Sequence, residues 1–110
     1  MGKRVLLVDD GNRSITDVTA RVLEQGGHEA IVYRGHDYRG YQADAVLYVA
    51  LDFERGPASL PSLRESYPSA VIVVFSPEVF TGRYSDAIRN SGARTLSMPA
   101  ENDQIVHALD

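Results

Sequence analysis

The segment Lys3-Arg-Val-Leu-Leu-Val-Asp-Asp10 decides how the rest of the chain is interpreted. Its four consecutive aliphatic residues end abruptly in two carboxylates, a pattern typical of a strand buried on both faces of a sheet. Ligands of open parallel sheets collect just outside the carboxyl ends of the strands. Adjacent carboxylates repel each other unless a cation lies between them, so Asp9 and Asp10 are candidates for a cation site.

The composition is that of one ordinary globular domain. A chain of 110 residues can bury one core, and we expect a single domain over residues 1–110. The net charge of −4 argues against nucleic-acid binding, and the absence of cysteine excludes disulfides and thiolate chemistry. No apolar run is long enough to span a bilayer and no signal peptide is recognisable, so we expect a cytoplasmic domain without membrane contact.

Apolar runs alternate with helical patterns along the whole chain. After the first strand we expect strands at 29–33, 45–51, 70–75 and 94–98, separated by helices. The first helix should turn a stripe inward and stop at Gly26-Gly27; this stripe comprises Ile15, Val18, Val22 and Leu23. The segment 34–42 is too polar and glycine-rich for a full second helix.

This alternation predicts right-handed βαβ crossovers and a mainly parallel sheet covered on both sides. We therefore expect an α/β fold of the flavodoxin-like, three-layer α/β/α type. Its five-stranded parallel sheet should have the order 2-1-3-4-5, with the second helix shortened or missing. In that order the ends of strands one, three and four meet at one crevice, which would contain Asp9, Asp10, residues 49–52 and Ser76.

Five short segments carry a resemblance to a known family that covers nearly the whole chain. They are Val5-Leu-Leu-Val-Asp-Asp10, Ala43-Asp-Ala-Val-Leu-Tyr48, Val71-Ile-Val-Val-Phe-Ser76, Gly92-Ala93 and Met98-Pro99. In order and spacing the chain resembles the CheY-like receiver domain of bacterial two-component response regulators. The resemblance implies an aspartate at the end of strand three that accepts a phosphoryl group, with acidic residues after strand one holding Mg²⁺. It also implies a Ser or Thr after strand four, an aromatic switch residue in strand five and a Lys after it.

Only part of that machinery is matched. The resemblance places Asp9 and Asp10 on the acidic pair and Ser76 on the hydroxyl. It places Val49 on the phosphoacceptor, Met98 on the lysine and Thr95 on the aromatic switch residue. A valine cannot be phosphorylated. Loss of the lysine is coherent with loss of the aspartate, because a buried ammonium without a phosphoryl partner is costly.

The leading hypothesis is therefore a degenerate receiver, or pseudo-receiver, that works as a protein-interaction module without phosphorylation. One alternative keeps a functional switch, with Asp52 accepting the phosphoryl group in a shifted register and Mg²⁺ held at Asp9 and Asp10. Another is a small-molecule binder that takes a nucleotide or flavin in the crevice.

The candidate site residues also have simpler, purely structural interpretations. Asp9 and Asp10 could merely favour the start of the first helix, and Ser76-Pro77 could be only a turn. Without a third carboxylate at Val49 any Mg²⁺ site should be weak, and we expect no other cofactor. The histidines show no ligand spacing and there is no phosphate-binding motif, so an enzyme lacks positive support.

Two segments are candidate contact surfaces for a protein partner or a second copy. The first is the loop with Tyr33, Arg34, Tyr38, Arg39 and Tyr41, since Tyr and Arg are enriched at binding hot spots. It could equally be a solvated loop whose tyrosines lean on the sheet edge. The second, implied by the resemblance, is the face of helix four, strand five and helix five; it includes Tyr84, Ile88, Arg94 and Ile105.

Overall fold

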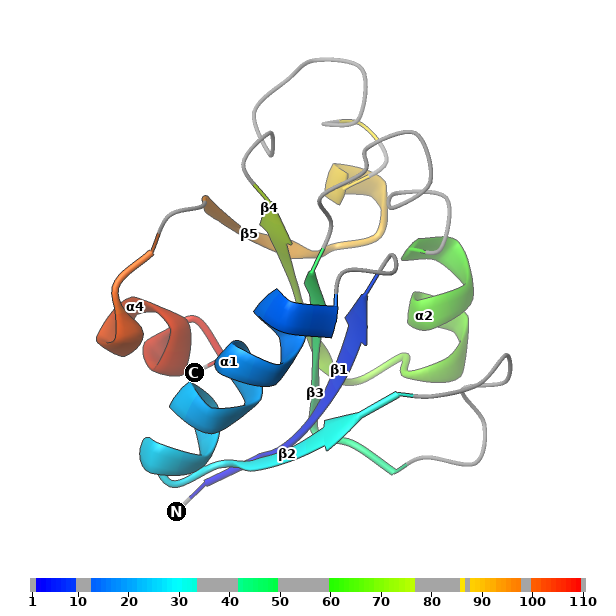
Figure 1. The fold of residues 1–110 in the computed structure, drawn as a ribbon. Helices are drawn as coiled ribbons and strands as arrows, with labels where there is room; N and C mark the ends of the chain where they lie inside the picture. The colour runs from blue at the N-terminus through cyan, green and yellow to red at the C-terminus, as the bar shows by residue number, and fades with distance from the viewer. Residues whose placement is uncertain are drawn as a thin grey trace.

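The computed structural model describes residues 2–9, 13–33, 42–49, 60–76, 86, 88–97 and 100–109, without the side chains of Asp9 and Arg13. Strands are interspersed with helices along these residues (Figure 1). The strands are β1 (Arg4–Asp9), β2 (Glu29–Val32), β3 (Ala45–Val49), β4 (Val71–Ser76) and β5 (Arg94–Ser97). The helices are α1 (Arg13–Gln25), α2 (Leu60–Ser66) and α4 (Asn102–His107), and residues 86 and 88–90 are also helical.

The strands form one parallel sheet in the order β2-β1-β3-β4-β5. This confirms the predicted flavodoxin-like topology. Tyr33 and residues 42–44, which flank the connection from β2 to β3, are not helical. Residues 34–41, on which the prediction of a short or missing helix rests, lie outside the described residues.

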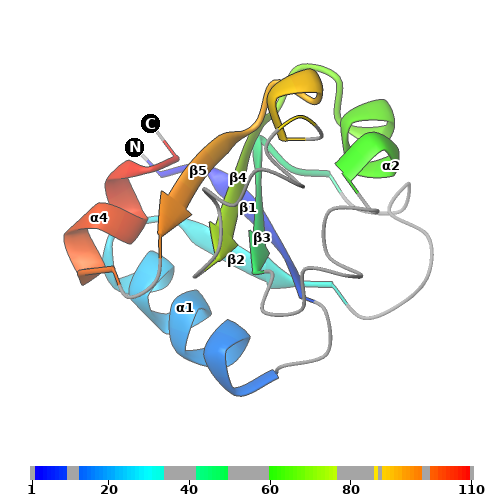
Figure 2. The same cartoon turned by 90° about the horizontal axis from the view of Figure 1, so that it is seen from above.

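Each face of the sheet carries its own apolar cluster. Figure 2 shows α1 and α4 on one side of the sheet and α2 on the other. Leu23 and Leu109 pack with alternate residues of β1 and β3 on the first face. Leu63 and Ile88 pack with the intervening residues on the second face. All five residues of β3 are buried, which explains why its apolar run is unbroken.

The buried stripe of α1 differs from the predicted one. Val22 and Leu23 are buried as expected, but Val18 is 59% exposed, so its prediction was wrong. Thr16 and Thr19 are buried instead. The Thr19 hydroxyl donates to the Ile15 carbonyl at 2.7 Å, which satisfies its polar group inside the core.

The predicted helix stop at the two glycines is confirmed. Gly27 has a φ of 93°, the left-handed conformation that glycine adopts without strain. The His28 amide donates to the Leu23 carbonyl at 2.9 Å and the Gly27 amide to the Glu24 carbonyl at 3.1 Å. These two bonds form a Schellman motif, which turns the chain directly into β2.

Arg64 joins the end of α2 to the helical residues 88–90 on the second face. Its Nε donates to the Ser91 carbonyl at 2.7 Å, and its Nη1 donates to the Ala70 carbonyl at 2.9 Å. Longer bonds from Nη1 reach the carbonyls of Tyr67 at 3.2 Å and Pro68 at 3.3 Å. One guanidinium therefore satisfies carbonyls from two segments that are separated by β4.

Candidate functional site

The carboxyl ends of β1, β3 and β4 meet at one edge of the sheet, as the predicted strand order requires. The register pairs Asp9 with Val49, and Val49 with Phe75. Ser76 is the next residue of β4 and pairs with Ser97 of β5. We call this region, defined by Asp9, Val49, Ser76 and Ser97, the carboxyl edge. It is the crevice region in which the sequence predicted a site.

Val49 is the last described residue of β3 and is fully buried. It belongs to the apolar cluster on the side of α1 and α4, together with Leu47 and Phe75. The register places it directly beside Asp9 in the neighbouring strand. Its side chain offers no oxygen to a metal ion or a phosphoryl group.

The carboxyl edge has two serines on neighbouring strands. Ser76 is fully buried, and its strand partner Ser97 is partly exposed. Sequence reasoning singled out Ser76 but missed Ser97, which becomes conspicuous only once the register of the edge strand is known. Thr95, at the predicted switch position, is exposed and pairs with Val74.

Several predicted site residues fall outside the described residues, and their roles stay predictions. They are Asp10, Asp52 and Met98 at the crevice, Arg34, Tyr38, Arg39 and Tyr41 in the first candidate contact loop, and Tyr84 on the second face.

Neither a metal centre nor a membrane span emerges from the described part of the chain. Among those residues, no group of three or more Asp, Glu or His side chains is arranged to hold a metal ion. The weak Mg²⁺ site predicted at Asp9 and Asp10 is not tested, because both side chains lie outside the description. No helix within the described ranges has the length and apolar character needed to cross a membrane.

The predicted contact residues on the second face divide into buried and exposed groups. Ile88 is 4% exposed and Ile105 is 5% exposed, and each packs into one of the two core clusters. Their prediction as surface residues needs correction, since they support the fold of that face from inside. Arg94 is exposed on the edge strand β5. Tyr33 is partly buried against the core cluster on the side of α2, so it leans on the sheet.

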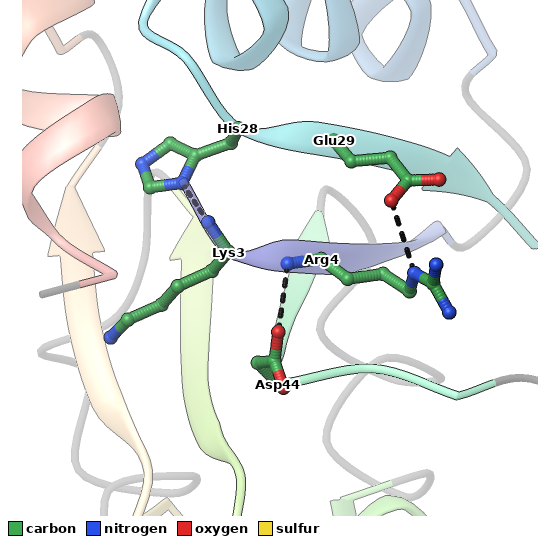
Figure 3. A network of polar contacts seen from close by, with 5 residues as sticks. All are labelled: Lys3, Arg4, His28, Glu29 and Asp44. Carbon is green, nitrogen blue, oxygen red and sulfur yellow. Dashed lines mark hydrogen bonds and ion pairs between the residues drawn. The ribbon is translucent and has the colours of Figure 1, made fainter. Parts of the chain in front are cut away.

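A network of polar contacts occupies the opposite, amino edge of the sheet (Figure 3). The Arg4 amide donates to the Asp44 carboxylate at 3.0 Å, and the Arg4 guanidinium pairs with Glu29 at 3.1 Å. The Lys3 amide donates to Nδ1 of His28 at 2.9 Å. These contacts line one side of a hollow of about 330 Å³. The Arg4–Glu29 ion pair and the hydrogen bonds of the Arg4 and Lys3 amides tie β1 to β2 and to the residue that precedes β3.

Comparisons of sequence alone give no assignment. No protein-family model matches the chain, and a search of curated proteins found no significant match.

Comparison of the structure gives strong matches. NtrX from Brucella abortus in complex with ADP superposes with a TM-score of 0.77 and 26% identity over 99% of this chain. A response regulator protein from Burkholderia pseudomallei with a phosphorylated aspartic acid, calcium ion and citrate gives 0.79 and 23% over 97%. A CheY-like receiver domain protein from Methanospirillum hungatei gives 0.79 and 20% over 97%.

The share of each matched protein differs widely. The chain spans 26% of the NtrX chain, 66% of the Burkholderia regulator and 90% of the Methanospirillum protein. The match therefore concerns about a quarter of the NtrX chain and most of the Methanospirillum protein. With its parallel sheet in the order β2-β1-β3-β4-β5, this chain has the fold of the CheY-like receiver domains of response regulators.

Proposed function

We propose that this chain is a receiver-like domain in two-component signalling that works through protein contacts and is not itself phosphorylated. The observation that carries the proposal is Val49. The resemblance assigns the phosphoacceptor to this position, and the register puts it beside Asp9 at the carboxyl edge.

The surroundings of Val49 suit a hydrocarbon side chain and not a reactive carboxylate. The side chain is fully buried and packs in an apolar cluster. A carboxyl group stays ionised in such a site only when a cation or hydrogen-bond donors compensate for lost solvation. Valine at this position removes the nucleophile and also removes the third ligand that would strengthen a Mg²⁺ site.

The output of such a domain is a fixed surface. On the face of the helical residues 86 and 88–90 and of β5, the exposed described side chains are polar: Asp86, Arg89, Asn90, Arg94 and Thr95. Asp86 and Arg89 form an exposed ion pair at 3.7 Å. We assign partner contact to this polar face, in place of the buried Ile88 and Ile105.

Amide NMR spectra recorded with Mg²⁺, before and after addition of beryllofluoride, test the phosphorylation part of the proposal. Beryllofluoride with Mg²⁺ mimics the phosphoryl group on a receptive aspartate. We expect the amides of Ser76 and Ser97 to keep their positions at millimolar reagent. Large local shifts at these amides that vanish in Asp52→Ala would instead assign the acceptor to Asp52 and make the chain a phosphorylated switch.

Two further measurements separate the remaining outcomes. A nucleotide or flavin that raises the melting temperature in the absence of beryllofluoride would support a small-molecule site instead. For partner contact, Arg89→Glu should weaken self-association in sedimentation, or capture of the cognate signalling protein. Arg21→Glu, a matched change on the exposed side of α1, should leave both unchanged.

A further inference from the structure

The carbonyl end of α4 is bound by side chains from three separate segments. His28, before β2, places Nε2 at 3.3 Å from the Val106 carbonyl. Arg94 of β5 donates to the Ala108 carbonyl at 3.3 Å, and Lys3, before β1, donates Nζ to the Leu109 carbonyl. The last carbonyls of a helix lack partners within the helix and carry partial negative charge, so donors here hold the helix in place.

His28 differs from the other two anchors because its contact depends on its protonation state. The Lys3 amide donates to Nδ1 at 2.9 Å (Figure 3), so Nδ1 must present a lone pair. The Val106 carbonyl can only accept, so Nε2 must carry the proton. The neutral ring with hydrogen on Nε2 is the one form that makes both bonds. The other neutral tautomer and the cation each place an N–H on Nδ1, against the Lys3 amide.

The ring has little access to water that could replace a lost bond, since His28 is 8% exposed. Its hydrogen-bond partners among the described residues are the two backbone groups, and no carboxylate is one of them. Charged groups on the surrounding elements are Lys3, Arg4 and Arg94 as cations, Glu24, Glu29 and Asp103 as anions, and the titratable His107. Glu29 is already paired with Arg4, and Lys3 and Arg94 add positive charge at the same helix end.

We propose that His28 is an acid-sensitive latch that fastens α4 to the amino edge of the sheet. The neutral ring links the Lys3 amide to the Val106 carbonyl. Uptake of a proton at Nδ1 removes the acceptor for the Lys3 amide and sets two N–H groups against each other. The cation keeps its N–H on Nε2, but relief of the clash at Nδ1 moves the ring, and this movement weakens the 3.3 Å contact with the Val106 carbonyl. Of the three side chains, only Lys3 and Arg94 then hold the end of α4. The pairing of β1, β3 and β4 does not involve the ring and should be unaffected.

An NMR pH titration of the whole chain tests the latch. The ring nitrogens of each histidine are followed individually through their long-range ¹H–¹⁵N couplings, from about pH 8 down to about pH 5, the range in which histidines titrate. At the highest pH of the titration we expect His28 to be the neutral tautomer with its hydrogen on Nε2. As it takes up a proton, the amides of Lys3 and Ala108 should shift with the same midpoint, while those of Leu47 and Val73 keep their positions.

Amide hydrogen exchange supplies the size of the effect. The Ile105 and Ala108 amides bond to the Glu101 and Gln104 carbonyls within α4. After correction for intrinsic exchange, their protection should fall about tenfold across the His28 titration, as expected when one buried bond is lost. His28→Gln, which cannot titrate, should abolish this dependence. His107→Gln, a change on the exposed face of the same helix, should retain it.

Three results would overturn the latch. The first is hydrogen on Nδ1 in the neutral ring. The second is a titration of His28 without any shift of the Lys3 and Ala108 amides. The third is loss of exchange protection at the β-sheet amides with the same midpoint, which would mean that the whole domain unfolds and that α4 is not released separately. The ring spectra come from the natural sequence, so they decide the matter even if His28→Gln does not fold.

Discussion

Arg64→Ala should be among the most destabilising substitutions of a partly exposed side chain in this protein. Hydrogen bonds made by charged groups contribute roughly 1.5–3 kcal/mol each. Counting only the two short bonds, at 2.7 and 2.9 Å to the Ser91 and Ala70 carbonyls, and taking the lower figure for each, gives about 3 kcal/mol. The two longer bonds are left out of the sum because they come from the same Nη1 that makes the shorter bond to Ala70.

The assay is urea unfolding followed by circular dichroism. For Arg64→Ala we expect the free energy of unfolding to fall by about 3 kcal/mol without a change in the dependence on urea. In a domain of this size the melting temperature should fall by about 12 °C, at about 4 °C for each kcal/mol. Arg64→Lys keeps the charge but lacks the planar fork that reaches both carbonyls, so it should recover at most half of the loss.

Arg21→Ala is the matched control, since Arg21 is exposed on α1. It should change stability by less than about 0.5 kcal/mol. A loss below about 1 kcal/mol for Arg64→Ala, or an Arg64→Lys variant as stable as the natural protein, would refute this account, because the carbonyls would then be satisfied equally well by water.

Three further predictions concern the amino edge, the α1–β2 turn and the carboxyl edge. A Cβ at Gly26 would lie 2.5 Å from the Val106 side chain, so Gly26→Ala should lower the free energy of unfolding in urea by about 1–3 kcal/mol. In a double-mutant cycle, Val106→Ala should relieve that loss. Glu29→Gln breaks an exposed pair with Arg4 and should cost less than about 1 kcal/mol, a difference that should shrink further in salt. Val49→Asp should cost at least about 2 kcal/mol at neutral pH. Burial should raise the pKa of the introduced carboxyl, so the variant should regain stability as the pH falls and the group becomes neutral. Equal destabilisation at neutral and at acidic pH would contradict this.

The parallel sheet could be predicted from the sequence because β1, β3 and β4 each contain an unbroken apolar run. Such runs are stable only in a parallel sheet covered on both faces, and the buried β3 shows this directly. The same property limits the prediction of the site. A strand that is apolar on both faces has no alternation, so its register cannot be derived from side-chain pattern alone. The pairing of Asp9 with Val49 and of Ser76 with Ser97 required the assembled sheet.

The misassigned stripe of α1 has a different cause. Sequence periodicity counts threonine as polar and valine as apolar, and it therefore turned Val18 inward. In the structure the Thr19 hydroxyl bonds to the Ile15 carbonyl, which lets a small polar side chain enter the core without a lost hydrogen bond. His28 and Arg64 escaped notice for a related reason. Their partners are backbone amide and carbonyl groups, which have no effect on the pattern of side chains in the sequence.

The contact between Lys3 and the Leu109 carbonyl spans a sequence separation of 106 residues. Synthesis proceeds at roughly 5–20 residues per second, so the Leu109 carbonyl is made about 5–20 s after the Lys3 side chain. The His28 ring waits across a separation of 78 residues for the Val106 carbonyl. The nascent chain can pair β1 with β2 and β3 in that interval, but it cannot seat α4. The ribosome thus makes Lys3 and His28 well before the helix that they hold.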